Sequence, residues 1–340
     1  MFIVNSYTLA VVLCFVTMLC WGSWGNTQKL AAKSWRYELF YWDYVIGMVL
    51  FALLLAFTAG SIGSQGRPFL ADLQQASWSS ILWILVGGII FNASNILLSA
   101  SVSLAGMSVA FPLGVGIALV LGVVNNYRVA VMQGSKTGNV ALLAIGVLLV
   151  VCAIVFNGIA SGRQSDAAAP KEARRKGVVL ALIAGVVMSF FSSFVMRAMD
   201  TTNFVSPEPG KVTPYTAIVL FTLGVLVSNF VFNTIVMRKP FVGEPVSYKE
   251  YFEGNFKTHL VGVLGGCIWC LGTALSYITA EKAGPAVSYA LGQGAPMVAA
   301  IWGVFIWKEF KGAKKGVYGL LAAMFCFFVA GLATIIIAGN

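Results

Sequence analysis

Two tryptophans and a glutamine near the end of the first long apolar segment could bind a small polar solute. Trp21, Trp24 and Gln28 follow the spacing i, i+3, i+7, which places them on one face of a helix. Indole rings can stack on a flat ring or on the apolar face of a sugar, and a carboxamide forms hydrogen bonds. Asn26 belongs to the same candidate site, and Lys29 follows it toward the cytoplasmic end. Gly22 and Gly25 could let another backbone approach or interrupt this helix. The alternative is an interfacial aromatic belt with a snorkelling lysine, which would not require the glycines and amides.

Polar and aromatic side chains recur at helical spacing in three other apolar segments. Asn92 and Asn95 lie on one face near the middle of the third segment, together with Ser99. The others are Trp269, Thr273 and Tyr277 in the eighth segment and Tyr289 and Gln293 in the ninth. Because polar groups are costly in lipid, we expect these side chains to face a cavity or another helix. For each asparagine alone, the alternative is a hydrogen bond that joins two helices.

Prolines and glycines cluster at matching places in the fourth and ninth segments. The residues are Pro112, Gly114 and Gly116 in the fourth and Gly292, Gly294 and Pro296 in the ninth. Such clusters can interrupt a helix and expose backbone groups to a ligand, and paired interruptions indicate a site near the middle of the membrane. The alternative is close packing of helices, which small residues also permit. We expect both segments to be interrupted.

One carboxylate lies inside an apolar segment, about one turn from its start. Asp43 could carry a coupling proton, with Lys29 as its partner across the first loop. A weak internal alignment places Arg197 opposite Lys29, so we include Arg197 among the coupling residues. The alternative for Asp43 is a carboxylate at the membrane interface, and sodium held by backbone carbonyls is the alternative to a proton. His259 is expected to be a loop-end residue.

The elements that position these residues are membrane-spanning helices. Of the 340 residues, 59% are hydrophobic and 10% are charged, and the mean hydropathy is +0.87, which is typical of a membrane protein. Apolar runs long enough to cross a bilayer occur at about 5–27, 39–60, 79–102, 106–127, 138–160, 177–199, 214–237, 258–280, 284–307 and 314–338. We therefore predict an all-α polytopic membrane protein with ten spans. The first span has no basic residue before Lys29, so we expect it to be retained rather than cleaved.

The positive charge of the chain indicates its orientation rather than a nucleic-acid partner. The odd-numbered loops contain 16 of the 22 Lys and Arg residues, and the even-numbered loops contain 6. The positive-inside rule places the odd loops in the cytoplasm, with both termini outside the cell membrane. All six cysteines fall within spans, and Cys267 and Cys270 form an isolated C-x-x-C pair. We expect packing rather than metal or redox chemistry, and no cofactor.

The chain matches itself after a shift of 178 residues. Gly87-Gly88 falls on Gly265-Gly266, and "GSKTGNVALLA" (134–144) falls on "GAKKGVYGLLA" (312–322). Spans 3–5 therefore repeat as spans 8–10. We predict a first five-helix repeat at 1–160, a basic cytoplasmic linker at 161–176 and a second five-helix repeat at 177–340. An odd number of spans inverts the second repeat, as in secondary transporters whose site lies where the repeats meet.

Several stretches resemble known transporter families. They are "CWGSWGNTQK" (20–29), "YWDY" (41–44), "TPYTA" (213–217), "RKPFVGEPVSYKEY" (238–251) and "AGPAVSYALGQGAPMVAAIWGVFIWKEF" (283–310). With ten spans in two inverted repeats, the chain resembles the drug/metabolite transporter superfamily. Within it, these stretches resemble the ureide permease family and the glucose/ribose porter family, and L-rhamnose–proton symporters more distantly. The resemblance implies uptake of small polar solutes, commonly driven by protons.

The function that we expect is secondary-active import of a sugar such as ribose, a nucleoside, or a ureide or nucleobase. We expect a monomer whose partners are the solute, the coupling ion and the lipid bilayer. One alternative is export of lipophilic cations or drugs, which would require a carboxylate deep in the cavity. Another is a membrane scaffold or receptor, which would not require paired helix interruptions. No phosphate-binding loop or catalytic triad is present in the sequence, so we do not expect an enzyme.

Overall fold

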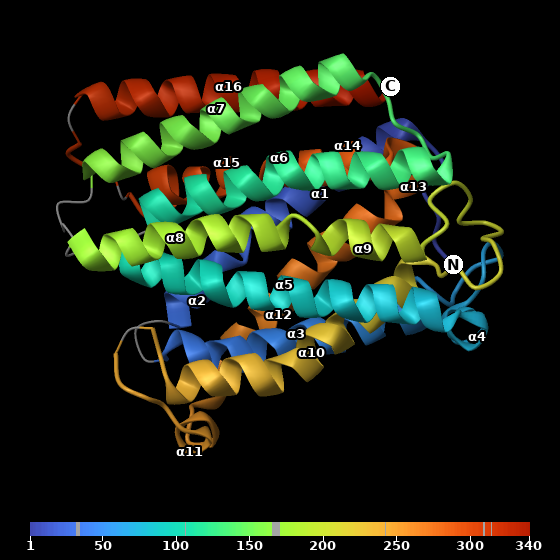
Figure 1. Ribbon diagram of the computed structural model, residues 1–340, viewed down its shortest axis with the longest axis horizontal. Coiled ribbons are helices and arrows are strands. Elements are labelled where there is room, and N and C mark those ends of the chain that lie inside the picture. The colour runs from blue at the N-terminus through green and yellow to red at the C-terminus, as the bar shows by residue number, and fades with distance from the viewer. Residues whose placement is uncertain (32–34, 106, 165–170, 242, 309, 314) are drawn as a thin grey trace.

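The computed structural model describes residues 1–31, 35–105, 107–164, 171–241, 243–308, 310–313 and 315–340. Ten of its helices are long and apolar enough to cross a membrane. They run roughly along one axis (Figure 1). The predicted class, an all-α polytopic membrane protein with ten spans, is confirmed.

Three short helices of the described chain lie outside these spans, and three spans consist of more than one helical piece. The helices are α1 (Tyr7–Ser23), α2 (Gly25–Ala31), α3 (Tyr37–Phe57), α4 (Phe69–Gln75), α5 (Trp78–Ala105), α6 (Met107–Gln133), α7 (Val140–Gln164), α8 (Lys171–Met188), α9 (Phe191–Ala198), α10 (Pro214–Arg238), α11 (Tyr248–Phe252), α12 (Phe256–Ile278), α13 (Ala280–Ala283), α14 (Pro285–Gly292), α15 (Ala295–Ile301), the π-helix η1 (Trp302–Ile306) and α16 (Lys315–Gly339). The first span is α1 with α2, the sixth is α8 with α9, and the ninth is α14, α15 and η1. The short helices outside them are α4, α11 and α13, with α2 completing the first span.

The predicted helix interruptions occur in one of the two matched spans. In the ninth span, α14 ends at Gly292 and α15 begins at Ala295. In the fourth span, α6 is a continuous helix through Pro112, Gly114 and Gly116, so that part of the prediction is wrong. Pro112 is only the sixth residue of α6, where a missing N–H costs a single hydrogen bond close to the helix start. The first span does break, at Trp24, between Gly22 and Gly25.

Glycines allow two pairs of helices to touch backbone to backbone. A Cβ at Gly266 of α12 would overlap the carbonyl of Tyr44 on α3, and one at Gly47 would lie 2.1 Å from the carbonyl oxygen of Val263. A Cβ at Gly88 of α5 would lie 2.3 Å from the carbonyl oxygen of Phe221 on α10. Any larger side chain would push these helices apart. The contacts therefore fix α3 against α12 and α5 against α10 near the middle of each pair.

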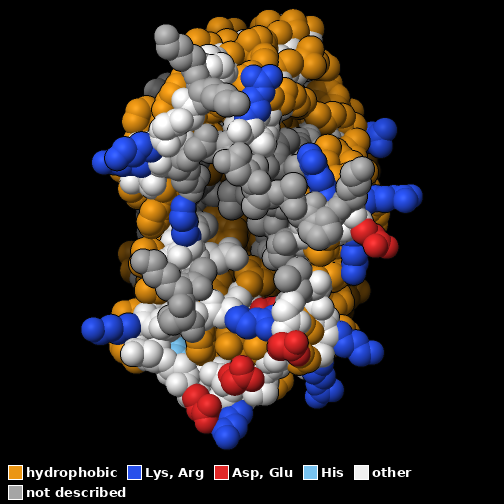
Figure 2. All heavy atoms as spheres, turned by 90° about the vertical axis from the view of Figure 1, so that its left-hand side faces the viewer, with side chains coloured by type: hydrophobic (Ala, Val, Ile, Leu, Met, Phe, Trp, Pro, Cys, Tyr) orange, Lys and Arg blue, Asp and Glu red, His pale blue; other side chains and the backbone are white. Residues whose placement is uncertain are grey.

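The two ends of the helix bundle differ. Both chain termini lie at one end, on the right of Figure 1, and we call this the terminal end. The opposite end carries α2 and α11. Figure 2 shows that end, with Lys and Arg side chains around its rim and a hollow between them. We call it the basic end. The helices α7 and α16 pack against each other at one side of the bundle (Figure 1).

Candidate transport site

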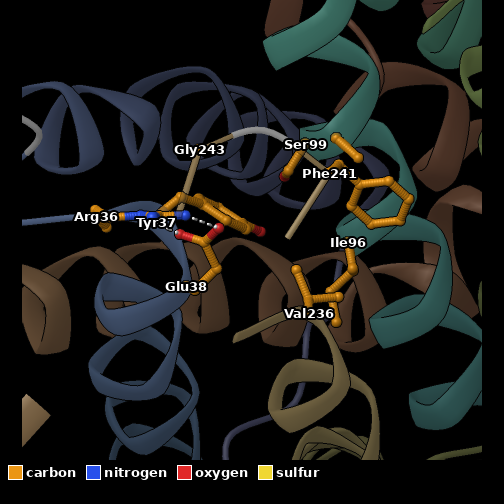
Figure 3. A pocket seen from close by; sticks show the side chains of 9 residues that line it. Arg36, Tyr37, Glu38, Ile96, Ser99, Val236, Phe241 and Gly243 are labelled. Carbon is orange, nitrogen blue, oxygen red and sulfur yellow. Dashed lines mark hydrogen bonds and ion pairs between the residues drawn. The ribbon is translucent and has the colours of Figure 1, made fainter. Parts of the chain in front are cut away.

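A cavity opens at the basic end between α3, α5 and α10. It has a volume of about 360 Å³ and is lined by Arg36, Tyr37, Glu38, Ile96, Ser99, Ala100, Val236, Phe241 and Gly243 (Figure 3). Arg36 and Glu38 form an ion pair of 2.7 Å at its wall, so their charges compensate each other. The remaining polar groups in the lining are the hydroxyls of Tyr37 and Ser99. The cavity is large enough for a small polar molecule.

A ladder of tyrosines leads from this cavity into the bundle along one face of α3. Tyr37, Tyr41 and Tyr44 follow the spacing i, i+4, i+7. The ring centroids of Tyr37 and Tyr41 are 5.3 Å apart, and those of Tyr41 and Tyr44 are 5.4 Å apart. The rings of Tyr41 and Tyr44 are buried and that of Tyr37 is partly buried. The hydroxyls of Tyr37 and Tyr44 make no hydrogen bond of normal geometry with the described residues. We call these three residues the tyrosine ladder.

The middle of the ladder meets both asparagines of the third span. The hydroxyl of Tyr41 donates to Oδ1 of Asn92 at 2.9 Å and accepts from Nδ2 of Asn95 at 3.1 Å. Asn92 also donates to the hydroxyl of Ser228 at 2.9 Å and to the carbonyl of Val225. Its amide thus joins α3, α5 and α10, which is the helix-joining role considered above. Asn95 is the more available of the two, because its side chain makes a single hydrogen bond to the described residues.

At its deep end the ladder reaches the aromatic residues that the sequence singled out. The ring of Tyr44 lies 4.9 Å from that of Trp24 and 6.4 Å from that of Trp269, and Trp269 stacks on Trp21 at 6.3 Å. The Nε1 of Trp21 donates to the hydroxyl of Thr273 at 3.1 Å. The structure therefore brings together four candidates from α1, α12 and the break in the first span.

The other candidates lie elsewhere. Asn26 accepts from the indole of Trp307 at 2.6 Å, at the basic end, and Gln28 is half-buried on α2 with no hydrogen bond to a described residue. Tyr289 donates to the carbonyl of Ala118 at 3.1 Å, which ties α14 to α6.

The rings of Tyr277 and Trp269 both contact that of Phe221, and the buried hydroxyl of Tyr277 has no hydrogen-bond partner among the described residues. Gln293 is buried at the C-cap of α14. The glycines nearby serve packing, because a Cβ at Gly292 would lie 2.8 Å from the ring of Trp21 and one at Gly294 would lie 2.6 Å from the sulfur of Met18.

The buried carboxylate of Asp43 has partners that the sequence did not predict. Its Oδ1 lies 2.6 Å from the hydroxyl of Tyr251 on α11 and 2.8 Å from Nδ1 of His259 on α12. Its Oδ2 is buried and accepts no hydrogen bond of normal geometry from a described residue. Burial, and then Asp43 itself, raises the pKa of Tyr251, so that its hydroxyl stays protonated and donates to Asp43. Asp43, Tyr251 and His259 form what we call the Asp43 cluster.

The two basic residues assigned to coupling do not take part in this cluster. Lys29, the predicted partner of Asp43, lies with its ammonium 4.5 Å from the ring of Trp307. Arg197 lies at the terminal end, with its guanidinium 5.0 Å from the ring of Trp83. The prediction that Lys29 pairs with Asp43 is therefore wrong, because Tyr251 of α11 and His259 of α12 contact the carboxylate instead. Among the described residues, no group of three or more His, Cys, Asp and Glu side chains could hold a metal ion.

Sequence reasoning missed the ladder and His259 for different reasons. The three tyrosines have the same helical spacing that drew attention to Trp21 and Trp24, so their signal was present in the sequence. His259 had no such signal. It lies 216 positions from Asp43 along the chain, and only the packing of α3 on α12 brings the two together.

Ten spans around a polar, aromatic path and a cavity at one end define a polytopic membrane protein of the permease type. The sequence profile of the ureide permease family matches residues 40–176 and 170–338. The chain therefore belongs to the ureide permease family, and it is a membrane transporter of small polar solutes rather than an enzyme.

Relatives from plants and bacteria agree with this assignment. Ureide permease 1 of Arabidopsis thaliana is 23% identical over 98% of this chain and 98% of its own length. A putative sugar uptake protein of Enterococcus faecalis is 22% identical over 93% of this chain and 96% of its own length. A solved crystal structure with 15% identity aligns with a TM-score of 0.62 over 96% of each chain, which shows a common fold.

Proposed function

We propose that the protein is a proton-coupled permease of the cell membrane that imports a small, neutral, polar solute. The observation that carries this proposal is the tyrosine ladder, which runs from the cavity to Trp24 and Trp269. The hydroxyl of Tyr44, at the deep end of the ladder, is buried and has no hydrogen-bond partner among the described residues. An unmade hydrogen bond of a buried group costs about 1–3 kcal/mol, so a solute that satisfies this hydroxyl would bind more tightly.

The groups along the path suit a neutral ring with several hydrogen-bonding groups. The described side chains around Tyr44 are aromatic rings, and those around Tyr41 are the carboxamides of Asn92 and Asn95. Rings of this kind stack on planar ureides and nucleobases and on the apolar face of sugars, and carboxamides pair with their polar edges. The names of the relatives include both ureide permeases and sugar uptake proteins. A sugar such as ribose, a nucleoside, and a ureide or nucleobase are the solutes proposed.

Asp43 is proposed to carry the coupling proton. It lies on α3 between Trp42 and Tyr44, so the helix that holds the tyrosine ladder also holds the carboxylate. A movement of α3 relative to α11 on solute binding would therefore move Asp43 relative to Tyr251. A carboxylate whose surroundings change in this way releases or takes up a proton. The unpaired Oδ2 is the atom on which that proton would reside.

Uptake into proteoliposomes tests the proposal. Ribose, allantoin, uracil and a quaternary ammonium cation are supplied outside in the presence of an inward proton gradient. We expect concentrative uptake of at least one neutral solute and none of the cation, and a protonophore should abolish the concentration step. Concentration of the cation alone would instead identify an exporter working in reverse.

The proposed orientation places the basic end in the cytoplasm and both termini outside, with inverted repeats at 1–160 and 177–340. The excess of Lys and Arg at the basic end supports it. Single cysteines that replace Gly162 and Asn340 should differ in their labelling when intact cells are treated with an impermeant maleimide. Position 340 should be labelled and position 162 protected. The opposite pattern would contradict the orientation, and labelling at both positions would contradict the inversion.

A further inference from the structure

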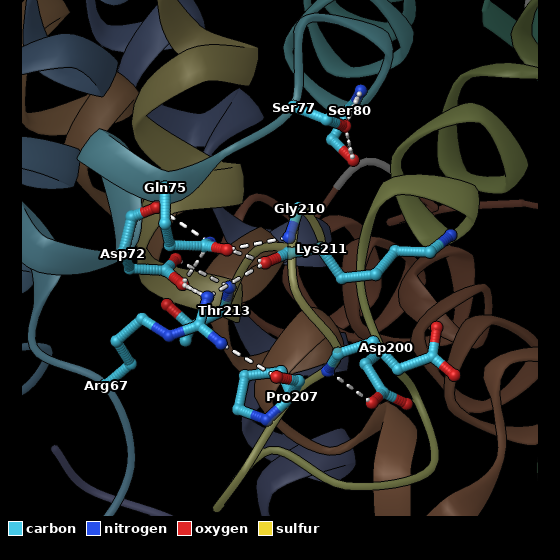
Figure 4. Close-up of polar contacts among 11 residues, drawn as sticks. Arg67, Asp72, Gln75, Ser77, Ser80, Asp200, Pro207, Gly210, Lys211 and Thr213 are labelled. Carbon is cyan, nitrogen blue, oxygen red and sulfur yellow. Dashed lines mark hydrogen bonds and ion pairs between the residues drawn. The ribbon is translucent and has the colours of Figure 1, made fainter.

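The terminal end of the bundle is closed directly opposite the cavity. The connection between α3 and α5 contains α4, and residues 199–213 connect α9 to α10. These two connections join at the ends of the same helices, α3, α5 and α10, whose other ends line the cavity. Figure 4 shows Arg67, Asp72 and Gln75 of the first connection facing Pro207, Gly210 and Lys211 of the second.

Arg67 and Asp72 make three hydrogen bonds across this junction and one to each other. Arg67 donates to Asp72 at 3.1 Å, to the carbonyl of Pro207 at 2.7 Å and to the carbonyl of Lys211 at 3.3 Å. The carboxylate of Asp72 is fully buried, and its Oδ2 accepts from the backbone N–H of Thr213 at 2.7 Å. Thr213 is the N-cap of α10, so Asp72 places its charge at the start of that helix.

Gln75 completes the junction, because its side chain both donates a hydrogen bond to the second connection and accepts one from it. Its amide nitrogen donates to the carbonyl of Lys211 at 2.8 Å, and its oxygen accepts from the N–H of Gly210 at 2.7 Å. We call Arg67, Asp72 and Gln75, with residues 207–213, the latch. The latch holds α10 to α5 at one end, whereas α5 and α10 separate around the cavity at the other.

The close contact of α5 with α10 lies between these two ends. A Cβ at Gly88 would lie 2.3 Å from the carbonyl oxygen of Phe221, and one at Gly224 would lie 2.4 Å from that of Leu85. Two helices in contact at their middle can tilt about that contact, so closing one end opens the other. A carrier must expose its site to each side in turn, and the closed end must therefore open once in every cycle.

We propose that Arg67 and Asp72 are the gating residues of the transport cycle, and that their bonds to residues 207–213 form and break as the terminal end closes and opens. This inference rests on the proposed function for its direction, with the terminal end outside.

The charged groups around Asp72 give the gate a direction of pH dependence. Arg67 is the described cation that contacts Asp72, because the ammonium of Lys211 donates to the carbonyl of Arg197 and the carboxylate of Asp200 accepts from Thr202 and from the N–H of Glu208. Burial raises the pKa of Asp72 above its usual range, although the nearby hydroxyl of Thr216, the N–H of Thr213 and the charge of Arg67 lower it. Opening would hydrate Asp72 and return its pKa toward the ordinary value. The closed form therefore binds a proton more tightly, and external acid favours closure.

A cysteine at Thr216 reports the state of the gate. Thr216 lies in the first turn of α10 and is fully buried, and its hydroxyl can be removed without loss of a normal hydrogen bond. In a chain whose six native cysteines are alanine, the Thr216→Cys protein is exposed to an impermeant maleimide from outside. Its labelling rate is divided by that of Asn340→Cys, which corrects for the pH dependence of thiol reactivity.

We expect Arg67→Gln and Asp72→Ala each to raise the normalised rate by about tenfold, since each removes several charge-assisted hydrogen bonds from the closed form alone. The matched control is Lys249→Gln, which removes an exposed ion pair to Glu253 at the basic end and should leave the rate unchanged. The parent rate should fall as the external pH falls, and Asp72→Ala should lose this dependence. If Asp72→Ala does not reach the membrane, Arg67→Gln decides.

Equal rates in the parent and in Arg67→Gln would overturn the gate, as would labelling that requires access from the basic end. The assay needs no transported solute, so it separates the two proposals. If the protein concentrates none of the tested solutes but Arg67→Gln still raises the labelling rate, the gate is supported and the proposed function is contradicted. If the protein transports solute normally but Arg67→Gln does not raise the labelling rate, only the gate is contradicted.

Discussion

Asp43→Asn should abolish solute accumulation driven by a pH gradient while leaving solute exchange across the membrane intact. The carboxamide has the shape of the carboxylate, and its oxygen can still accept from Tyr251 and His259 as Oδ1 does now. It cannot exchange a proton, so net coupled movement should fall to the background of empty liposomes. Exchange of labelled for unlabelled solute needs no net proton movement and should continue. The two activities are measured in the same proteoliposome preparation.

The matched control is Glu253→Gln, which neutralises an exposed carboxylate that pairs with Lys249 beside the Asp43 cluster. It should leave both accumulation and exchange at the parental level. Loss of exchange as well as accumulation in Asp43→Asn would indicate misfolding, and His259→Gln then provides the second variant of the cluster. An Asp43→Asn protein that still concentrates solute in response to a proton gradient would remove Asp43 from the coupling mechanism.

The membrane fold could be predicted almost completely from the sequence, because lipid imposes a simple rule. Each span must satisfy its own backbone hydrogen bonds, so long apolar runs become helices. All ten predicted runs correspond to spans of the structure. The interruption at Pro112 was predicted wrongly because the sequence does not show whether a proline lies near the start of a helix or in its middle. In the ninth span, where α14 ends at Gly292, the same signal was correct.

The candidate site was predicted in part, and distance along the chain explains the difference. The faces of single helices follow from local spacing, so Trp21 and Trp24 were found on one surface. Which helix such a face meets depends on tertiary packing. The close contact of Gly266 with α3 sets the partners of Asp43, and one sequence gives no indication of that contact. Lys29 was chosen because it is near in the sequence, whereas His259 is near in space.

Tyr44→Phe should raise the solute concentration needed for half-maximal uptake by about five- to thirty-fold, the effect of one hydrogen bond worth 1–2 kcal/mol. The hydroxyl of Tyr44 has no hydrogen-bond partner among the described residues, so its removal leaves none of them unpaired and should not lower stability. The ring remains against Trp24 and Trp269. The maximal uptake rate should therefore stay near that of the parent.

Tyr215→Phe provides the comparison. Its hydroxyl donates to the carbonyl of Phe2 at 3.0 Å, at the terminal end, so that its loss should lower stability without changing solute affinity. Equal half-maximal concentrations in the parent and in Tyr44→Phe would show that the ladder is a packing feature.

Protection of Ser99→Cys by solute tests most directly the claim that solute passes through the cavity between α3, α5 and α10. Ser99 lines the cavity beside Tyr37, and cysteine is close to serine in size (Figure 3). In inside-out vesicles, with the native cysteines replaced, a maleimide should label position 99 and stop uptake. The solute that the protein transports should slow the labelling, and Tyr44→Phe should shift the protecting concentration upward with its half-maximal uptake concentration. Labelling that is unaffected by saturating solute, or uptake that continues after complete modification, would contradict this path.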